Sequence, residues 1–143
     1  MTALPIVAAS TNPHFERLGG QAAVQRLVDA FYAAMDERAD ARTIRAMHAA
    51  DLGPTKDVLV SYLCEWLGGP RRYSAEQGAP MLRRRHQPFD IDTAARDAWM
   101  NCMRQALAQT CDDTELRAAL EAALQKVADH LVNLHPSSTH RSP

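Results

Sequence analysis

The residue with the clearest chemical potential is His86, which closes the run Met81-Leu82-Arg83-Arg84-Arg85-His86 and stands two positions before Pro88. Taken alone, this run allows two interpretations. His86 is either a surface histidine in a basic stretch, or an imidazole that ligates a metal while neighbouring guanidiniums hold the anionic edge of a cofactor. The rest of the chain must decide between them.

The elements that position this histidine are expected to be helices. Ala, Leu, Arg, Glu and Gln dominate the 143 residues and β-branched residues are sparse, which is typical of an all-α protein. The length predicts one domain that is large enough to bury a core. We place this domain at residues 14–134, between a flexible leader at 1–13 and a disordered tail at 135–143.

Apolar residues recur at helical spacing along most of the chain. The clearest case lies between Gln21 and Arg38, where Val24, Leu27, Val28, Phe31, Tyr32 and Met35 share one face. We expect a short helix at 14–18 before the Gly19-Gly20 pair. Further helices are expected at 40–48, from Pro54 or Thr55 to Gly68, around Ser74, up to His86, from Asp92 or Thr93, and at 115–133. Ser74 and Gln77 have the spacing of a capping box.

The composition excludes several function classes. The formal net charge of −1 favours neither nucleic acid nor an anionic membrane, and no apolar run approaches the length of a membrane span. Cys64, Cys102 and Cys111 have no CxxC spacing, so free thiols in a reducing cytoplasm are expected. No Ser-His-Asp spacing, phosphate loop or carboxylate pair stands out.

An ordered set of motifs is more specific. The set is Gly19-Gly20, Phe31-Tyr32, Trp66-Leu67-Gly68-Gly69-Pro70, Tyr73, Gly78-Ala79-Pro80-Met81-Leu82-Arg83-Arg84-Arg85-His86 and Arg96-Asp97-Ala98-Trp99-Met100-Asn101-Cys102-Met103. In this order and at these intervals, the chain from about Phe15 to Asn133 resembles a bacterial truncated haemoglobin of the second group. The resemblance implies a globin-like, truncated two-over-two helical sandwich around one haem b.

In this family the histidine at the place of His86 is the proximal iron ligand. A neutral imidazole nitrogen would supply the fifth ligand and leave the sixth position open, while its other N–H donates to a backbone carbonyl that fixes the tautomer. Arg85, with Arg83 and Tyr73, is expected to contact the haem propionates, because guanidinium groups pair well with carboxylates. Each of these three is otherwise an exposed surface group.

The resemblance also implies a distal pocket, lined by Tyr32, His48, Thr55, Leu59, Tyr62 and Trp99. The Tyr32 hydroxyl and the Trp99 indole N–H are hydrogen-bond donors, and bound O₂ carries superoxide-like charge. In a site screened from water each such bond would contribute on the order of 1–3 kcal/mol. The expected consequence is slow release of O₂, which argues against a simple carrier.

The sequence departs from the family pattern in two places. The connection from Arg45 to Asp51 is longer than usual, so that His48, Met47 or Arg45 could face the ligand, with His48 preferred and a solvated loop histidine as the alternative. Ala79 replaces a frequent histidine, which weakens any hydrogen bond from that turn but not haem binding. Thr55 stands where full-length globins have a distal histidine, and a small side chain there leaves a shorter entry path.

The expected function is reversible binding of O₂, NO and CO for storage, scavenging or sensing. The alternative is an enzyme that performs NO dioxygenation or peroxide reduction. Because the chain has no flavin or NAD(P)H motif, that activity would require an external reductase. A haem-free helical module that binds an anionic partner through the arginines is the remaining class, and a monomer and a homodimer are equally open.

Overall fold

The computed structural model describes residues 14–79 and 81–133, and every regular element in these ranges is a helix. The helices are α2 (His14–Leu18), α3 (Gly20–Glu37), α4 (Arg42–Ala46), α5 (Gly53–Trp66), α6 (Arg72–Gln77), α7 (Leu82–His86), α8 (Thr93–Thr110) and α9 (Thr114–Leu131), with a 3-10 turn η1 (Ala39–Ala41) before α4. The all-α prediction is therefore confirmed for this part of the chain. The predicted leader at 1–13 and the predicted tail at 135–143 lie outside the described residues.

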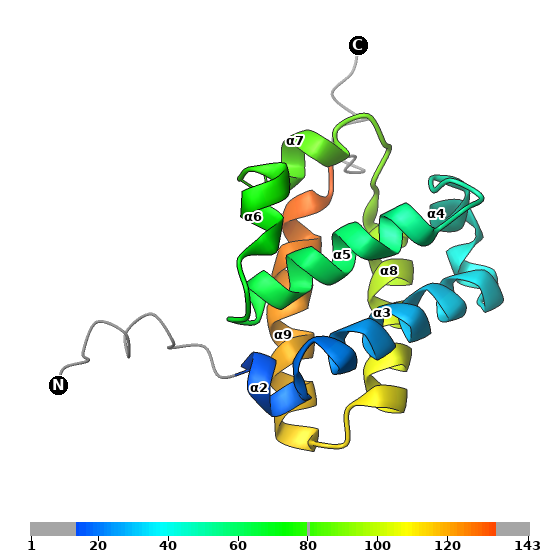
Figure 1. Ribbon diagram of the computed structural model, residues 1–143. Helices are drawn as coiled ribbons and strands as arrows, with labels where there is room; N and C mark the ends of the chain where they lie inside the picture. The colour runs from blue at the N-terminus through cyan, green and yellow to red at the C-terminus, as the bar shows by residue number, and fades with distance from the viewer. Residues whose placement is uncertain (1–13, 80, 134–143) are drawn as a thin grey trace, which may run out of the picture.

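Four long helices form two crossed pairs. Figure 1 shows α3 and α5 running across α8 and α9, with α4 beside the start of α5 and α6 beside its end. The layers meet where α3 packs on α8, through the predicted apolar face of α3 (Val24, Leu27, Val28, Phe31, Tyr32 and Met35) and through Cys102, Met103, Ala106 and Leu107 of α8. All of these side chains are buried. This is the two-over-two arrangement that the resemblance implied.

The long helices α8 and α9 begin at aspartate caps. The Asp92 carboxylate accepts the Ala95 backbone N–H at 2.8 Å, and the Asp113 carboxylate accepts the Leu116 N–H at 3.0 Å. A capping carboxylate satisfies a donor that the first turn leaves unpaired. The sequence allowed Asp92 or Thr93 as this cap, and the structure shows that Asp92 is the cap and Thr93 the first helical residue.

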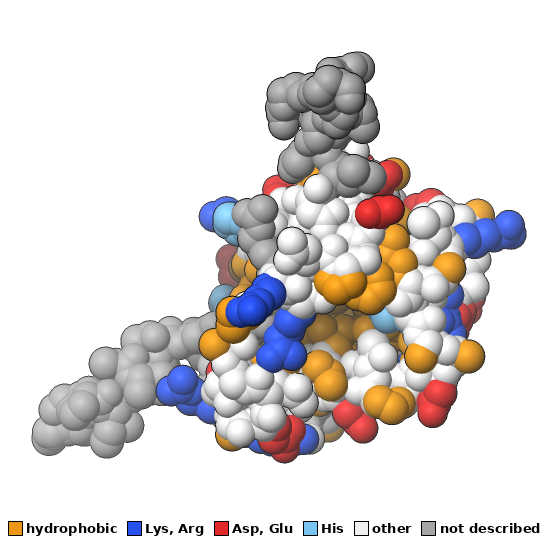
Figure 2. Space-filling model, turned by 90° about the horizontal axis from the view of Figure 1, so that it is seen from above, with side chains coloured by type: hydrophobic (Ala, Val, Ile, Leu, Met, Phe, Trp, Pro, Cys, Tyr) orange, Lys and Arg blue, Asp and Glu red, His pale blue; other side chains and the backbone are white. Residues whose placement is uncertain are grey.

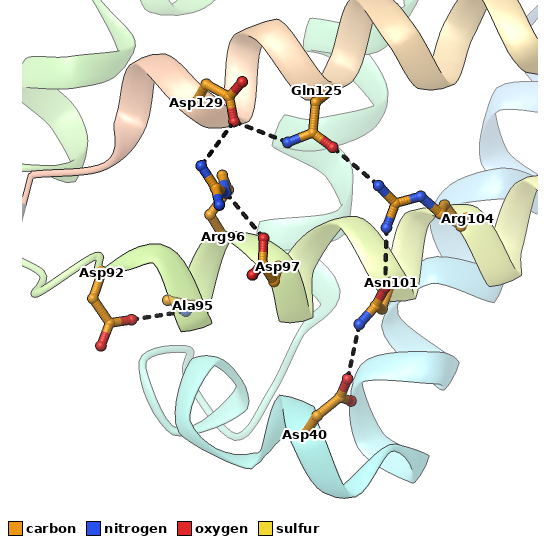
Figure 3. A network of polar contacts seen from close by, with 9 residues as sticks. All are labelled: Asp40, Asp92, Ala95, Arg96, Asp97, Asn101, Arg104, Gln125 and Asp129. Atoms are coloured by element: carbon orange, nitrogen blue, oxygen red, sulfur yellow. Dashed lines mark hydrogen bonds and ion pairs between the residues drawn. The ribbon is translucent and has the colours of Figure 1, made fainter. Parts of the chain in front are cut away.

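A chain of polar side chains then joins α8 to α9 and η1. Its contacts run from Asp129 through Arg96 on one side and through Gln125, Arg104 and Asn101 to Asp40 on the other (Figure 3). These groups lie on the outside of the helix pair, where each hydrogen bond contributes modestly to stability. The network links α8, α9 and η1 along their solvent-exposed side.

Two glycine positions show why this packing needs glycine. Gly19 has φ 122°, a left-handed conformation that lets the chain turn from α2 into α3. At Gly69 a Cβ atom would lie 2.7 Å from the Phe15 ring, and Phe15 N–H also donates to Leu67 O at 3.0 Å. The absent side chain therefore lets α2 dock directly on the turn after α5.

One local expectation is wrong. Ser74 does not cap α6: the helix begins at Arg72, and the Ser74 N–H and hydroxyl both donate to the Glu65 carboxylate of α5, at 2.9 and 3.0 Å. A carboxylate from another helix has replaced the local capping box. Along α5, Leu63 is buried and Leu59, Tyr62 and Trp66 are partly buried against the core, whereas Val58 is 41% exposed.

Among the described residues, no helix has both the length and the apolar character that crossing a bilayer demands.

Candidate functional site

One large cavity lies between the two helix pairs and the short helices that cover them. Its volume is about 550 Å³, and its wall is made mostly of aliphatic and aromatic side chains. Figure 2 looks into it from above: hydrophobic side chains form the floor, a histidine shows within it, and Lys or Arg side chains lie beside the mouth. Such a volume and lining suit a largely apolar organic cofactor.

Every predicted site residue whose side chain is described lines this cavity. They are Tyr32, His48, Thr55, Leu59, Tyr62, Tyr73, Arg85, His86 and Trp99. They come from α3, the connection after α4, α5, α6, α7 and α8, so residues that are far apart in sequence converge on one space. Arg83 lies in α7, but its side chain falls outside the described part of the structure.

His86 enters the cavity from the end of α7 with one ring nitrogen already engaged. Its Nδ1 lies 2.7 Å from the backbone oxygen of Leu82, one turn earlier. Because a carbonyl oxygen can only accept, Nδ1 must carry the hydrogen, and in the neutral ring the lone pair is then on Nε2. The imidazole is thus prepared to act as a metal ligand through Nε2, and the hydrogen bond predicted from the sequence is present.

Tyr32 and Trp99 are held in place by the ring of Phe31. The Phe31 and Tyr32 ring centroids are 4.9 Å apart and the Phe31 and Trp99 centroids 5.2 Å apart, both with edge-to-face geometry. Burial raises the pKa of the Tyr32 hydroxyl to about 12, which keeps it a hydrogen-bond donor at neutral pH. Within the described part of the chain, no protein group accepts from this hydroxyl or from the Trp99 indole N–H. Both donors therefore remain available to a ligand in the cavity.

Their contacts reduce the choice among His48, Met47 and Arg45 for the residue that faces the ligand. The Arg45 guanidinium pairs with Asp36 at 2.6 Å and also donates to the carbonyls of Ala49 and Ala50, so it does not line the cavity. His48 and Met47 both line it, and the His48 ring lies edge-to-face against Tyr32 at 5.7 Å.

His48 is also fixed in one tautomer. Its Nδ1 lies 2.8 Å from Ile44 O, so a neutral His48 presents an accepting Nε2. This refines the expectation of a ligand-facing polar group: neutral His48 accepts a hydrogen bond, and it donates through Nε2 only when protonated.

At the mouth of the cavity, Tyr73 and Arg85 form one unit. The Arg85 guanidinium donates to Gln77 O at 2.7 Å and lies 5.8 Å from the centre of the Tyr73 ring, which in turn packs edge-to-face on Tyr62 at 5.5 Å. Tyr73 is buried rather than exposed, whereas Arg85 is exposed. The cation therefore has a defined position at the rim, and it retains N–H donors that can pair with an anionic group.

Several cavity residues were not predicted as such from the sequence. They include Leu82, Phe89, Ile91, Arg96, Val127 and Leu131. Val127 and Leu131 do follow the helical spacing of α9, but periodicity alone does not tell a wall that faces protein from one that faces a cavity. Phe89 and Ile91 belong to a loop, where no periodic signal exists.

The cysteines take no part in this site. All three are free and buried, and burial raises the pKa of the Cys64 thiol and raises that of Cys102 to about 11. A thiol that stays protonated is a poor nucleophile. In the described ranges, moreover, no group of three or more His, Cys, Asp or Glu side chains could hold a bare metal ion.

An apolar cavity with a tautomer-fixed histidine at the end of α7 and arginine at the mouth fits a metal that arrives inside a flat, anionic organic cofactor. Fold and cavity thus define a small helical haem protein. A family model for bacterial-like globins matches residues 13–133. The chain belongs to the bacterial-like globin family and is a haem-binding globin.

Individual relatives agree with this assignment. A group 2 truncated haemoglobin of Bacillus subtilis (strain 168) is 36% identical over 124 residues, which cover 87% of this chain and 91% of the relative. The structure of a group II 2-on-2 haemoglobin from Agrobacterium tumefaciens has a TM-score of 0.81 and 39% identity, and the match covers 84% of this chain and 93% of that one. A truncated oxygen-avid haemoglobin from Bacillus subtilis has a TM-score of 0.77 and 34% identity, over 84% and 98% of the two chains. The resemblance seen in the sequence is therefore confirmed.

Proposed function

We propose that this globin binds haem b through the Nε2 atom of His86 and reversibly holds O₂, with NO and CO as further ligands. The observation that carries the proposal is the 2.7 Å contact from His86 Nδ1 to Leu82 O, which in the neutral ring puts the lone pair on Nε2. When bound, the haem supplies an iron with one coordination position open to a diatomic gas. The protein supplies the anchor, the apolar walls and the hydrogen bonds.

The distal residues support tight holding of O₂. Tyr32 keeps its proton because burial raises its pKa to about 12, and the Trp99 indole nitrogen is a donor only. No described protein group accepts a hydrogen bond from either donor, so both can donate to a polar ligand. Each bond would contribute on the order of 1–3 kcal/mol in a water-poor cavity, which predicts slow O₂ release. One of the matched structures is itself described as oxygen-avid.

The rim residues support the orientation of the cofactor. Arg85 is held by Gln77 O and the Tyr73 ring, so its remaining N–H groups are pre-positioned for a propionate carboxylate. Arg83, one helical turn from the end of α7, is proposed for the same role from the sequence alone. Three free buried cysteines fit a reducing cytoplasm as the working compartment.

The decisive experiment replaces His86 with alanine in the full chain. His86→Ala should lose haem, or lose the five-coordinate ferrous absorption spectrum and form an abnormal CO complex. His130→Ala is the matched control, because His130 is an exposed histidine of α9 that does not line the cavity. An unchanged ferrous spectrum in His86→Ala would disprove the ligand assignment.

A further inference from the structure

The segment that follows His86 is fastened to the end of α9 by one residue, Asn133. The Asn133 Nδ2 group donates to Phe89 O at 2.9 Å and to His86 O at 3.4 Å, while its Oδ1 accepts the Ile91 N–H at 2.8 Å. The Asn133 backbone N–H also donates to Ile91 O, at 2.9 Å. One residue thus makes four hydrogen bonds to the segment 86–91.

This segment makes few other hydrogen bonds to the rest of the protein, although Ile91 is partly buried against the core. Residues 87–90 are exposed and belong to no helix. The remaining hydrogen bonds of the segment are local, such as Phe89 N–H to His86 O at 3.0 Å. Among the described residues, every hydrogen bond that ties the segment to an element other than α7 involves Asn133. Local bonds shape the turn, but Asn133 sets where the turn lies.

The clamped residues are cavity residues. His86, Phe89 and Ile91 all line the cavity, and Val127 and Leu131 of α9 line it from the side on which Asn133 is anchored. The four bonds therefore fix the spacing between the α9 wall and the segment that carries the imidazole.

We propose that Asn133 is a positioning residue, which holds His86 in register with the cavity and thereby governs how firmly the iron–imidazole bond is kept. The inference rests on the proposed role of His86 as the iron ligand. Asn133 suits this task because a carboxamide both donates and accepts, and the segment presents two carbonyls and one N–H to it. No other side chain of this length offers both functions without charge.

Two variants separate these bonds. Asn133→Leu removes all three side-chain bonds and leaves the backbone bond to Ile91. Asn133→Asp keeps an acceptor for the Ile91 N–H but loses both donors toward Phe89 and His86. Asn101→Leu is the control, because Asn101 also makes two side-chain hydrogen bonds, to Asp40 and Arg104, but does not line the cavity.

The test uses the full-length holoprotein. The rate at which ferric haem is transferred to excess apomyoglobin is measured together with the iron–histidine stretching band of the ferrous form by resonance Raman spectroscopy. Urea unfolding of the same variants without haem reports the cost to the fold. We expect Asn133→Leu to release haem about tenfold faster, with a shifted or broadened band, and Asn133→Asp to shift the band in the same sense. Asn101→Leu should match the wild type in both haem measurements, even where it unfolds more easily.

Two outcomes would overturn the inference in different ways. Wild-type haem transfer and an unchanged band in Asn133→Leu, whatever its unfolding midpoint, would show that Asn133 is merely structural and leave the role of His86 intact. His86→Gly, measured in parallel, should lose the band and regain it on addition of imidazole. A band that persists in His86→Gly without imidazole would remove the proposed ligand itself, and the inference with it.

Discussion

The interface between α3 and α8 and the cavity wall are built from similar residues but are filled differently. At the interface, Phe31, Val28, Met103 and Leu107 have 0% exposure, so protein atoms occupy all the space around them. Along the cavity, Leu59, Tyr62 and Trp99 are only partly buried, and Val58 and Phe89 are 41% and 39% exposed. The same class of side chain therefore stabilises the fold in one region and is kept apart for a cofactor in the other.

This difference indicates which residues contribute most to the free energy of unfolding. Tight packing makes each methylene group at the interface count toward the free energy of unfolding. Side chains on the cavity wall have few partners on one side, and they gain them only when the cofactor binds. The packed layer should therefore contribute fully to stability with and without haem, whereas the wall should contribute mainly when haem is bound.

A matched pair of leucines gives the largest predicted effect. Leu107→Ala in the packed layer should lower the free energy of unfolding by about 2–5 kcal/mol, because Leu107 is fully buried and leaves a cavity behind. Leu59→Ala on the cavity wall should cost less than about half as much in the haem-free protein, since Leu59 already borders open space. Urea unfolding monitored by circular dichroism measures both.

The same pair should behave differently once haem is added. Haem binds only the folded state, so it should raise the stability of the wild type and of Leu107→Ala by similar amounts. For Leu59→Ala the gain should be smaller, because contacts to the cofactor are lost. Equal losses for the two leucines in the haem-free protein would contradict the distinction between the two regions.

The packed layer was also the region that the sequence predicted best. The inward faces of α3 and α8 follow directly from helical periodicity. In α8 this face consists of Trp99, Cys102, Met103, Ala106 and Leu107, and every residue of the two faces is buried except Trp99, which is partly buried. Asp92 was readable as a cap because the residue type and the start of the periodic pattern agree. The capping box predicted at Ser74 was wrong because Ser74 donates to Glu65, nine positions earlier in the sequence. Short-range patterns carry no information about such contacts.

The cavity was predictable only in part. Tyr32, Trp99 and His86 were found through the family resemblance, and the structure brings them to one space. Val58 and Val127 have the same helical spacing as core residues. Whether such a residue packs in the core or lines the cavity depends on how the helices cross. Asn133 had no signal at all, because its role arises from contacts to residues more than 40 positions away.

Substitutions at the distal donors should separate ligand kinetics from stability. Tyr32→Phe should speed O₂ dissociation by about tenfold, the equivalent of roughly 1.4 kcal/mol, because it removes one donor and no ring packing. Trp99→Phe should act in the same direction, with an added effect of lost volume. The free energy of unfolding without haem should change by less than about 1 kcal/mol in Tyr32→Phe, since no described protein group accepts from that hydroxyl. Stopped-flow displacement of O₂ by CO measures the rates.

Tyr73→Phe is the control for this experiment. Tyr73 lines the same cavity but sits at the mouth, against Tyr62 and Arg85, so its hydroxyl should not influence release of O₂. If Tyr32→Phe and Trp99→Phe both keep wild-type off-rates, the two-donor explanation of slow release fails.

The smallest predicted effect concerns acid stability at the end of the packed layer, where Asp113 caps α9. The Leu116 N–H, followed by Arg17 at 2.7 Å, holds the pKa of the Asp113 carboxyl below its usual range. Its contribution should therefore be present above the unfolded-state pKa of about 3.9 and be lost as the pH falls through the lower folded-state pKa. Asp113→Asn retains a capping oxygen without the charge, so its free energy of unfolding should fall less steeply on acidification. The effect should be the same with and without haem, because Asp113 does not border the cavity. The control is Asp112→Asn, at a neighbouring position that does not cap the helix. It should follow the wild type in urea titrations from pH 7 to pH 3. If the free energy of unfolding falls equally steeply with pH in all three proteins, the Asp113 contacts add nothing to stability.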